Sequence, residues 1–223
     1  MFRPLFEDRR DAGRRLARAL ARRAERAPAG WGAPGEAPLV LGLPRGGVPV
    51  ALEVARELGA PLDVLVVRKL GLPGHEELAI GAVASGGAQV LNRDLVRSLR
   101  VERQAIERVR ARELAELERR ERSYRGARPP LDVRGRHVIV VDDGVATGAT
   151  MRVAVAALKQ AGARWVTVAV PLAAPDACEQ LSREADEVVC LETPEPFDSV
   201  GQWYARFEQT SDAEVTRALA EAG

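Results

Sequence analysis

Two adjacent acids, Asp142 and Asp143, are the most chemically informative residues of this sequence. They follow the apolar run Val138–Val141, whose β-branched side chains predict a parallel strand buried on both faces. The acids would then stand at the carboxyl end of that strand, where open α/β sheets bind ligands. Residues 147–150 supply hydroxyls, a glycine and free backbone N–H groups at the start of an Ala-rich helix, which suits a phosphate dianion. The segment therefore predicts a site for a phosphorylated sugar.

The whole segment, VIVVDDGVATGAT, resembles the signature with which type I phosphoribosyltransferases bind phosphoribosyl pyrophosphate (PRPP). The resemblance implies that Asp142 and Asp143 hydrogen-bond the 2′- and 3′-hydroxyls of the ribose. It also implies that the following turn wraps the 5′-phosphate, through Ala146, Thr147, Gly148, Ala149 and Thr150. Each feature alone is usually an ordinary turn or a helix cap, but their occurrence together and in this order favours the sugar-phosphate site.

A second glycine-containing turn, LPRGG at residues 43–47, follows the first predicted strand. Its two glycines expose backbone N–H groups beside Arg45 at the start of a helix. The alternative is a tight strand-to-helix turn without a ligand. In the family the corresponding loop binds pyrophosphate, which implies that role for Arg45, Gly46 and Gly47. The family's loop can also carry a non-proline cis peptide, and the matching bond is Pro44-Arg45.

Two adjacent cations, Arg68 and Lys69, follow the second predicted strand. Such a pair is poorly placed for a core and well placed for phosphates. The segment 68–77 is similar to the mobile catalytic loop of adenine-type members, although it is one residue shorter between Gly71 and Pro73. The resemblance implies that Arg68 binds substrate and that Lys69, with Arg45, assists the departure of pyrophosphate.

The residues that would hold the acceptor are less well defined. Hypoxanthine-type members carry an aspartate just before the Thr-Gly of the signature, and this chain has Ala146. The resemblance therefore argues against a 6-oxopurine mechanism without identifying another base. Aromatic residues, including Phe197 and Trp203, concentrate after the last predicted strand. Stacking on a base and packing of a hood against the core are both open interpretations of these two side chains.

Composition limits the class of protein. At 223 residues with 46% hydrophobic residues, the chain can build one sizeable α/β domain. The formal charge of +1 provides no overall field for nucleic acid or an anionic membrane. The sequence has no membrane-length apolar run and no signal-peptide core, so we expect a soluble, cytoplasmic protein. Cys178 and Cys190 lack CxxC spacing, which predicts reduced thiols rather than a disulfide.

The predicted fold is α/β, with a doubly wound, mainly parallel five-stranded sheet and a small hood built from the chain ends. Its strands are expected at 39–43, 62–67, 138–141, 165–170 and 187–191. A hairpin is expected at 78–91, and a charged surface helix or subunit contact at 95–124. The expected divisions are a helix and linker at 1–37, a core at 38–191 and a tail at 192–223, in which a helix follows a capping box at 211–214.

Together these features predict transfer of the phosphoribosyl group from PRPP to a nitrogenous base, with release of pyrophosphate. The resemblance implies Mg²⁺ bound mainly through PRPP, because no cluster of carboxylates forms a dedicated cage for the ion. A homodimer is open. The first alternative is a non-catalytic module that senses PRPP or a nucleotide, since fold does not fix function. The second is a hydrolase or transferase that acts on another ribose phosphate.

Overall fold

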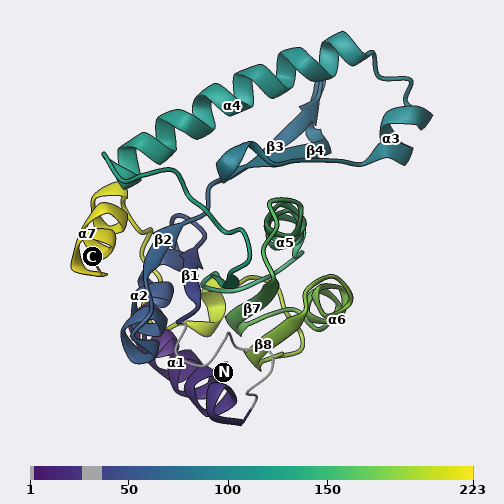
Figure 1. Ribbon diagram of the computed structural model, residues 1–223. Helices are drawn as coiled ribbons and strands as arrows, with labels where there is room; N and C mark the ends of the chain where they lie inside the picture. Colours follow the sequence, from purple (N-terminus) through teal and green to yellow (C-terminus); the bar gives the residue numbers. More distant parts are fainter. Residues whose placement is uncertain (1–2, 27–36, 223) are drawn as a thin grey trace.

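The computed structural model describes residues 3–26 and 37–222. Its main sheet contains five parallel strands in the order β2-β1-β6-β7-β8 (Figure 1). The predicted fold class is confirmed, although the second strand ends at Val64 instead of Val67. The strands are β1 (Leu39–Gly42), β2 (Leu62–Val64), β6 (His137–Val141), β7 (Trp165–Leu172) and β8 (Glu187–Glu192).

Helices cover both faces of this sheet, which explains the continuous apolar runs. In β6, Ile139 and Val141 join the core beneath α1 (Arg9–Arg26), α2 (Gly47–Leu58) and α7 (Asp212–Ala222). Val138 and Val140 point to the opposite face, where α5 (Ala149–Gln160) and α6 (Pro175–Glu184) close the second core. Alternate residues of one strand therefore fill two separate cores.

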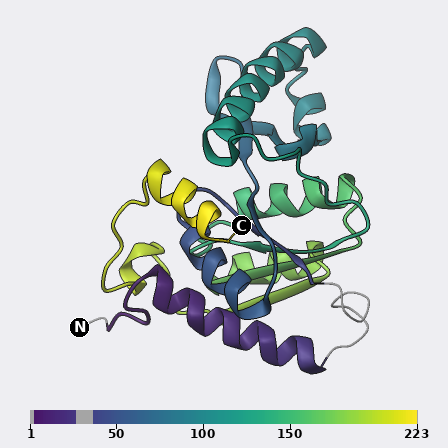
Figure 2. The ribbon, with the colours of Figure 1, turned by 60° about the vertical axis from the view of Figure 1, so that its left-hand side comes forward.

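A three-stranded antiparallel sheet extends from the core with two helices, and we call these elements the arm (Figures 1 and 2). The predicted hairpin lies in it, but the segment 68–77, expected to be a loop, forms most of its first strand and the start of its second. The turn between them uses Gly74 at φ 81°, which L side chains rarely adopt. The arm consists of β3 (Val67–Leu72), β4 (His75–Ala84), β5 (Gln89–Leu91), α3 (Arg93–Ser98) and α4 (Arg103–Arg125).

The charged segment expected as one helix is thus divided into α3 and α4. The buried face of α4 contains Ile106, Val109, Glu113, Leu117 and Tyr124, which recur at helical spacing. This face packs against β3 and against α7. α4 therefore joins the arm to the core instead of lying free on the surface.

The start of the described chain meets the tail segment around residue 204 beside β7. Phe6 pairs with Tyr204 in a short parallel bridge, and both pack with Trp203 and Leu172. The capping box that opens α7 is present, because Ser211 Oγ accepts the Glu214 N–H and the Glu214 carboxylate accepts the Ser211 N–H. Most of the linker expected at 27–38 lies outside the described residues. None of the helices within 3–26 and 37–222 is long and apolar enough to cross a membrane.

Candidate functional site

The two predicted loops meet because β1 and β6 are neighbours in the sheet. These strands run parallel with Gly42 opposite Val141, so the turn after each leaves the same sheet edge. A Cβ atom on Gly46 would lie 1.9 Å from Asp143 Oδ2, and one on Gly47 would lie 2.5 Å from the Val141 carbonyl oxygen. Only glycines allow this close approach. The LPRGG turn therefore lies directly against the acid pair.

The turn has the backbone geometry that the resemblance implied, since the Pro44-Arg45 peptide is cis. The Arg45 side chain extends toward the start of α7, where its Nη1 lies 3.8 Å from Asp212 Oδ1. Arg45 is thus close to the acids along the backbone, while its guanidinium group contacts a different element.

A cavity of about 200 Å³ lies at the turn after the acids. Asp142, Gly144 and the turn residues 145–151 line it, together with Val200 from the tail. Gly148 has φ 74° and caps α5, whose first residue is Ala149. The N-terminus of α5 therefore lies at the cavity. A Cβ atom on Gly144 would lie 2.5 Å from Val200, which shows how tightly the tail covers this turn.

The acid pair is half-buried, and the Asp143 side chain is 14% exposed. Asp142 Oδ1 accepts the backbone N–H of Asp143 at 2.9 Å. Burial raises the pKa of Asp142 well above its ordinary value, and the neighbouring Asp143 charge raises it further. Burial also raises the pKa of Asp143, while the Arg9 guanidinium acts in the opposite direction. Two carboxylates held this close resist being ionised together, so a ligand that donates hydrogen bonds to both would relieve an unfavourable interaction.

Arg9 is the site residue that sequence reasoning missed. Its Nε donates to Asp143 Oδ2 at 2.7 Å, and its Nη1 donates to the Glu208 carbonyl oxygen at 2.6 Å. The guanidinium also lies 3.9 Å from the ring centroid of Phe207. Arg9 of α1 thus contacts both the acid pair and the tail. No local signal distinguishes Arg9 from the many other arginines of α1.

Tyr204 is a second missed contact. Its hydroxyl donates to the Asp143 carbonyl oxygen at 2.5 Å, and its ring stacks on Phe207. Burial raises the pKa of this hydroxyl, which keeps it protonated as a donor.

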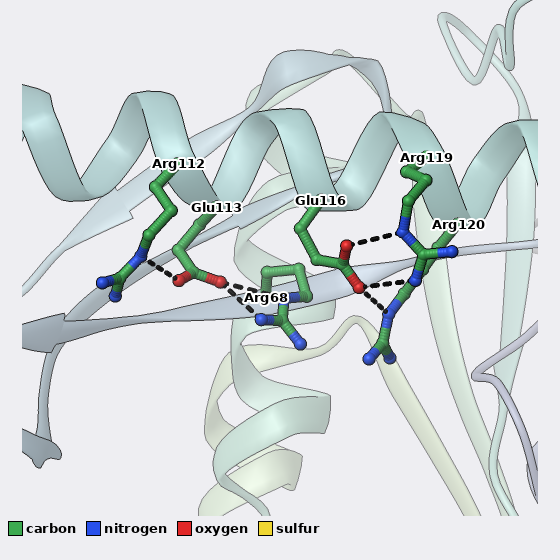
Figure 3. Close-up of polar contacts among 6 residues, drawn as sticks. All are labelled: Arg68, Arg112, Glu113, Glu116, Arg119 and Arg120. Carbon is green, nitrogen blue, oxygen red and sulfur yellow. Dashed lines mark hydrogen bonds and ion pairs between the residues drawn. The ribbon is translucent and has the colours of Figure 1, made fainter.

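The two arm cations have different surroundings. Arg68 donates from Nε and Nη2 to Glu113 Oε2 of α4, at 3.0 and 2.6 Å, and Arg112 contacts the other oxygen (Figure 3). Lys69 Nζ lies 3.3 Å from Glu77 Oε2, and its side chain is 57% exposed. Arg68 therefore ties α4 to β3 in this structure, while Lys69 stays accessible. The predicted roles of both toward phosphate remain predictions.

The two predicted stacking residues also differ. Trp203 is 6% exposed and packs with Phe6 and Leu172, a placement that matches the packing interpretation. Phe197 is half-buried at the edge of the same cluster. Phe197 is the more accessible of the two for a base.

Comparisons with known proteins agree with the predicted family. The family model described as "Phosphoribosyl transferase domain" matches residues 8–202. Proteins of two Mycobacterium tuberculosis strains, each named "Putative phosphoribosyl transferase", are 48% identical over 226 residues. The match covers 98% of this chain and 49% of those relatives, so the chain spans about half their length. The crystal structure of TT1426 from Thermus thermophilus is 47% identical with a TM-score of 0.82, over 97% of this chain and 98% of that one.

Proposed function

The chain belongs to the phosphoribosyl transferase domain family, and on that basis we propose that it transfers the phosphoribosyl group of PRPP to a nitrogenous base. One observation carries the proposal: the order of groups along a single sheet edge. The 145–151 turn and its cavity are followed by the acid pair and then by the LPRGG turn. PRPP presents a 5′-phosphate, ribose hydroxyls and a diphosphate in that same order.

The proposed reaction needs charge stabilisation more than a nucleophilic side chain. The bond from C1 to the diphosphate oxygen breaks, a bond from C1 to the base nitrogen forms, and the base loses a proton to a neighbouring group or to water. The intermediate ribose is oxocarbenium-like, so positive groups near the departing diphosphate would contribute most. We assign that role to Arg45 and Lys69, with Asp142 and Asp143 holding the ribose.

We expect Mg²⁺ to bind together with PRPP. Carboxylate oxygens such as those of Asp142 and Asp143 are donors that Mg²⁺ accepts. Across residues 3–26 and 37–222, no group of three or more His, Cys, Asp or Glu side chains is placed to hold a metal. We therefore propose that substrate oxygens and water supply most of the coordination.

Isotope exchange tests this function directly. With PRPP, Mg²⁺ and a panel of bases, the protein is expected to move label from inorganic pyrophosphate into PRPP in the presence of at least one base. A Lys69→Met variant should exchange about tenfold more slowly or worse, because a charge beside the leaving group is lost. PRPP binding without exchange for any base would instead favour the sensing module, and absence of PRPP binding would reject both.

The identity of the base gives a second prediction. Ala146 cannot accept a proton, so guanine and hypoxanthine are expected to be poor substrates in a base screen.

Phe197→Ala should lower kcat/KM for the active base if Phe197 stacks on it. Trp203→Ala is expected to lower the free energy of unfolding by about 3–5 kcal/mol, since it empties a buried site. Fast turnover of hypoxanthine, or full activity of Phe197→Ala with every base, would contradict this placement of the acceptor.

A further inference from the structure

A second polar cavity, of about 230 Å³, lies on the Arg45 side of the LPRGG turn. Its lining brings together residues from three separate elements: Arg45 of the turn, residues of the last part of α4, and the residue that opens α7. None of the residues that line the 200 Å³ cavity at the signature turn lines this one. The polar lining consists of Arg45, Arg119, Arg120, Ser123, Tyr124 and Asp212.

The α4 arginines are held in place by one carboxylate. Arg119 donates from Nε and Nη2 to the two oxygens of Glu116, at 2.7 and 2.9 Å, and Arg120 Nε donates to Oε1 at 2.9 Å (Figure 3). These hydrogen bonds lower the pKa of Glu116 to about 2, so its carboxylate stays charged at neutral pH. They engage only some of the N–H donors of each guanidinium group, and the remaining donors are available for a ligand.

The position of these arginines follows from the buried face of α4. Glu113, Glu116, Arg120 and Tyr124 succeed one another three or four residues apart, so they lie along one side of the helix. At Glu113 that side contacts the arm, through Arg68. At Tyr124 it reaches α7, where the Tyr124 hydroxyl donates to Asp212 Oδ1 at 2.9 Å. α4 thus places Arg119 and Arg120 between the arm and the LPRGG turn, where they line the same cavity as Arg45.

The charge of the cavity favours an anion. Three guanidinium groups line it, and two carboxylates oppose them: Asp212 in the lining and Glu116, which holds Arg119 and Arg120, so the positive charge remains in excess. The Asp212 carboxylate is already engaged by the Tyr124 hydroxyl and lies 3.8 Å from Arg45 Nη1. Several guanidinium groups facing one space match a ligand with many oxygens and more than one negative charge, which is the chemistry of an oligophosphate.

We propose that Arg119 and Arg120 of α4, together with Arg45, form a binding site for a diphosphate group. Its identification with the diphosphate end of PRPP rests on the proposed function, whereas binding of the anion does not. Asp142 lines the first cavity, and Asp143 touches Gly46 of the turn that carries Arg45 into the second. The acid pair therefore lies between two anion sites, as the ribose of PRPP lies between its 5′-phosphate and its diphosphate.

The test is calorimetric titration of inorganic pyrophosphate, with Mg²⁺, into the full chain. An Arg119→Gln/Arg120→Gln variant is expected to bind about tenfold more weakly or worse, because charge-assisted hydrogen bonds are lost. The matched control is Arg122→Gln, which changes an exposed arginine of α4 outside the cavity lining and should bind as the parent does. Thermal unfolding of each variant confirms that it is folded.

Two further variants separate the causes. The double variant leaves Glu116 without its clamped arginines, so a triple variant with Glu116→Gln removes that charge and is expected to show the same loss. Asp176→Asn, which changes an exposed acid of α6 outside both cavities, should retain pyrophosphate binding. Equal affinity of parent and double variant, recovery in the triple variant, an equal loss in Asp176→Asn, or no binding by the parent would each overturn the site. Arginine-dependent pyrophosphate binding without isotope exchange would uphold the site while rejecting the transferase.

Discussion

Asp142→Asn is expected to weaken PRPP binding by about 1–3 kcal/mol, the range for losing a hydrogen bond to a charged partner. Every 1.4 kcal/mol is about tenfold in affinity. The asparagine oxygen can still accept the Asp143 N–H, which Asp142 Oδ1 now accepts at 2.9 Å, so the local backbone should be preserved. The change removes an ionisable carboxyl group beside Asp143. PRPP titration and thermal unfolding of the same preparation measure the two effects.

Although Asp142→Asn is expected to weaken PRPP binding, it is expected to raise the free energy of unfolding. Burial raises the pKa of Asp142 above its ordinary 3.8, so the folded chain keeps a proton that the unfolded chain releases. The contribution of Asp142 to stability is therefore fully present below about pH 4, the pKa of the unfolded chain, and is lost as pH rises toward the folded-state pKa. Asp142→Asn lacks that loss and is expected to be more stable than the parent at pH 7.

The control for this pair of results is Asp176→Asn, which changes an exposed acid of α6 outside the site. It should leave PRPP affinity unchanged and keep the parent's dependence of stability on pH. If Asp142→Asn bound PRPP as tightly as the parent, the assignment of the acid to the ribose would be wrong. If the parent and Asp142→Asn lost stability equally between pH 4 and 7, the raised pKa of Asp142 would not be the cause of the pH dependence.

Arg9→Met is expected to move the pH dependence of PRPP binding to higher pH. Arg9 opposes the rise in the pKa of Asp143 that burial causes, so its removal should raise that pKa further. A protonated carboxyl group accepts weaker hydrogen bonds, hence affinity falls as pH falls through the pKa. In the variant this fall should begin at a higher pH. Titrations of PRPP with the parent and the variant over the same pH series, from acidic to above neutral, would compare the two midpoints.

Two variants show whether Arg9 acts through its charge. Arg9→Lys keeps the positive charge but cannot reproduce both the Glu208 contact and the stack on Phe207, so a partial return of the midpoint is expected. Arg10→Met changes the next, exposed residue of α1 and should titrate like the parent. Identical midpoints for parent and Arg9→Met would show that Arg9 only packs α1 against the tail.

The strand, the acids and the two glycine turns could be predicted from the sequence because each depends on local physics. A continuous β-branched run such as Val138–Val141 is stable only where both faces are buried. Gly46 and Gly47 mark a turn in which the backbone comes too close for a side chain. The five-stranded parallel sheet follows from several such strands separated by helices. All of these signals lie within a few residues of the structure they predict.

The arm was predicted less well, since its form depends on a partner distant in sequence. Arg68 was expected in a mobile loop, but it lies in β3, where Glu113 of α4, 45 residues later, accepts its hydrogen bonds. The alternating charges of α4 correctly indicated a helix and cancelled in sum. Summed charge carries no information about which side of a helix faces a cavity, so the convergence of Arg119 and Arg120 on Arg45 could not be predicted.

The surroundings of the acid pair were decided by tertiary structure alone. The sequence determined that Asp142 and Asp143 end a buried strand, because hydrophobic periodicity and turn chemistry are local. It did not determine that Arg9, 134 residues earlier, donates to Asp143, or that Tyr204 of the tail donates to the same residue. The sequence pattern of an amphipathic helix is the same whether one of its arginines faces solvent or a carboxylate. Only the packing of α1 and of the tail around residue 204 against β7 places Arg9 within 2.7 Å of Asp143 and so sets the charge of the site.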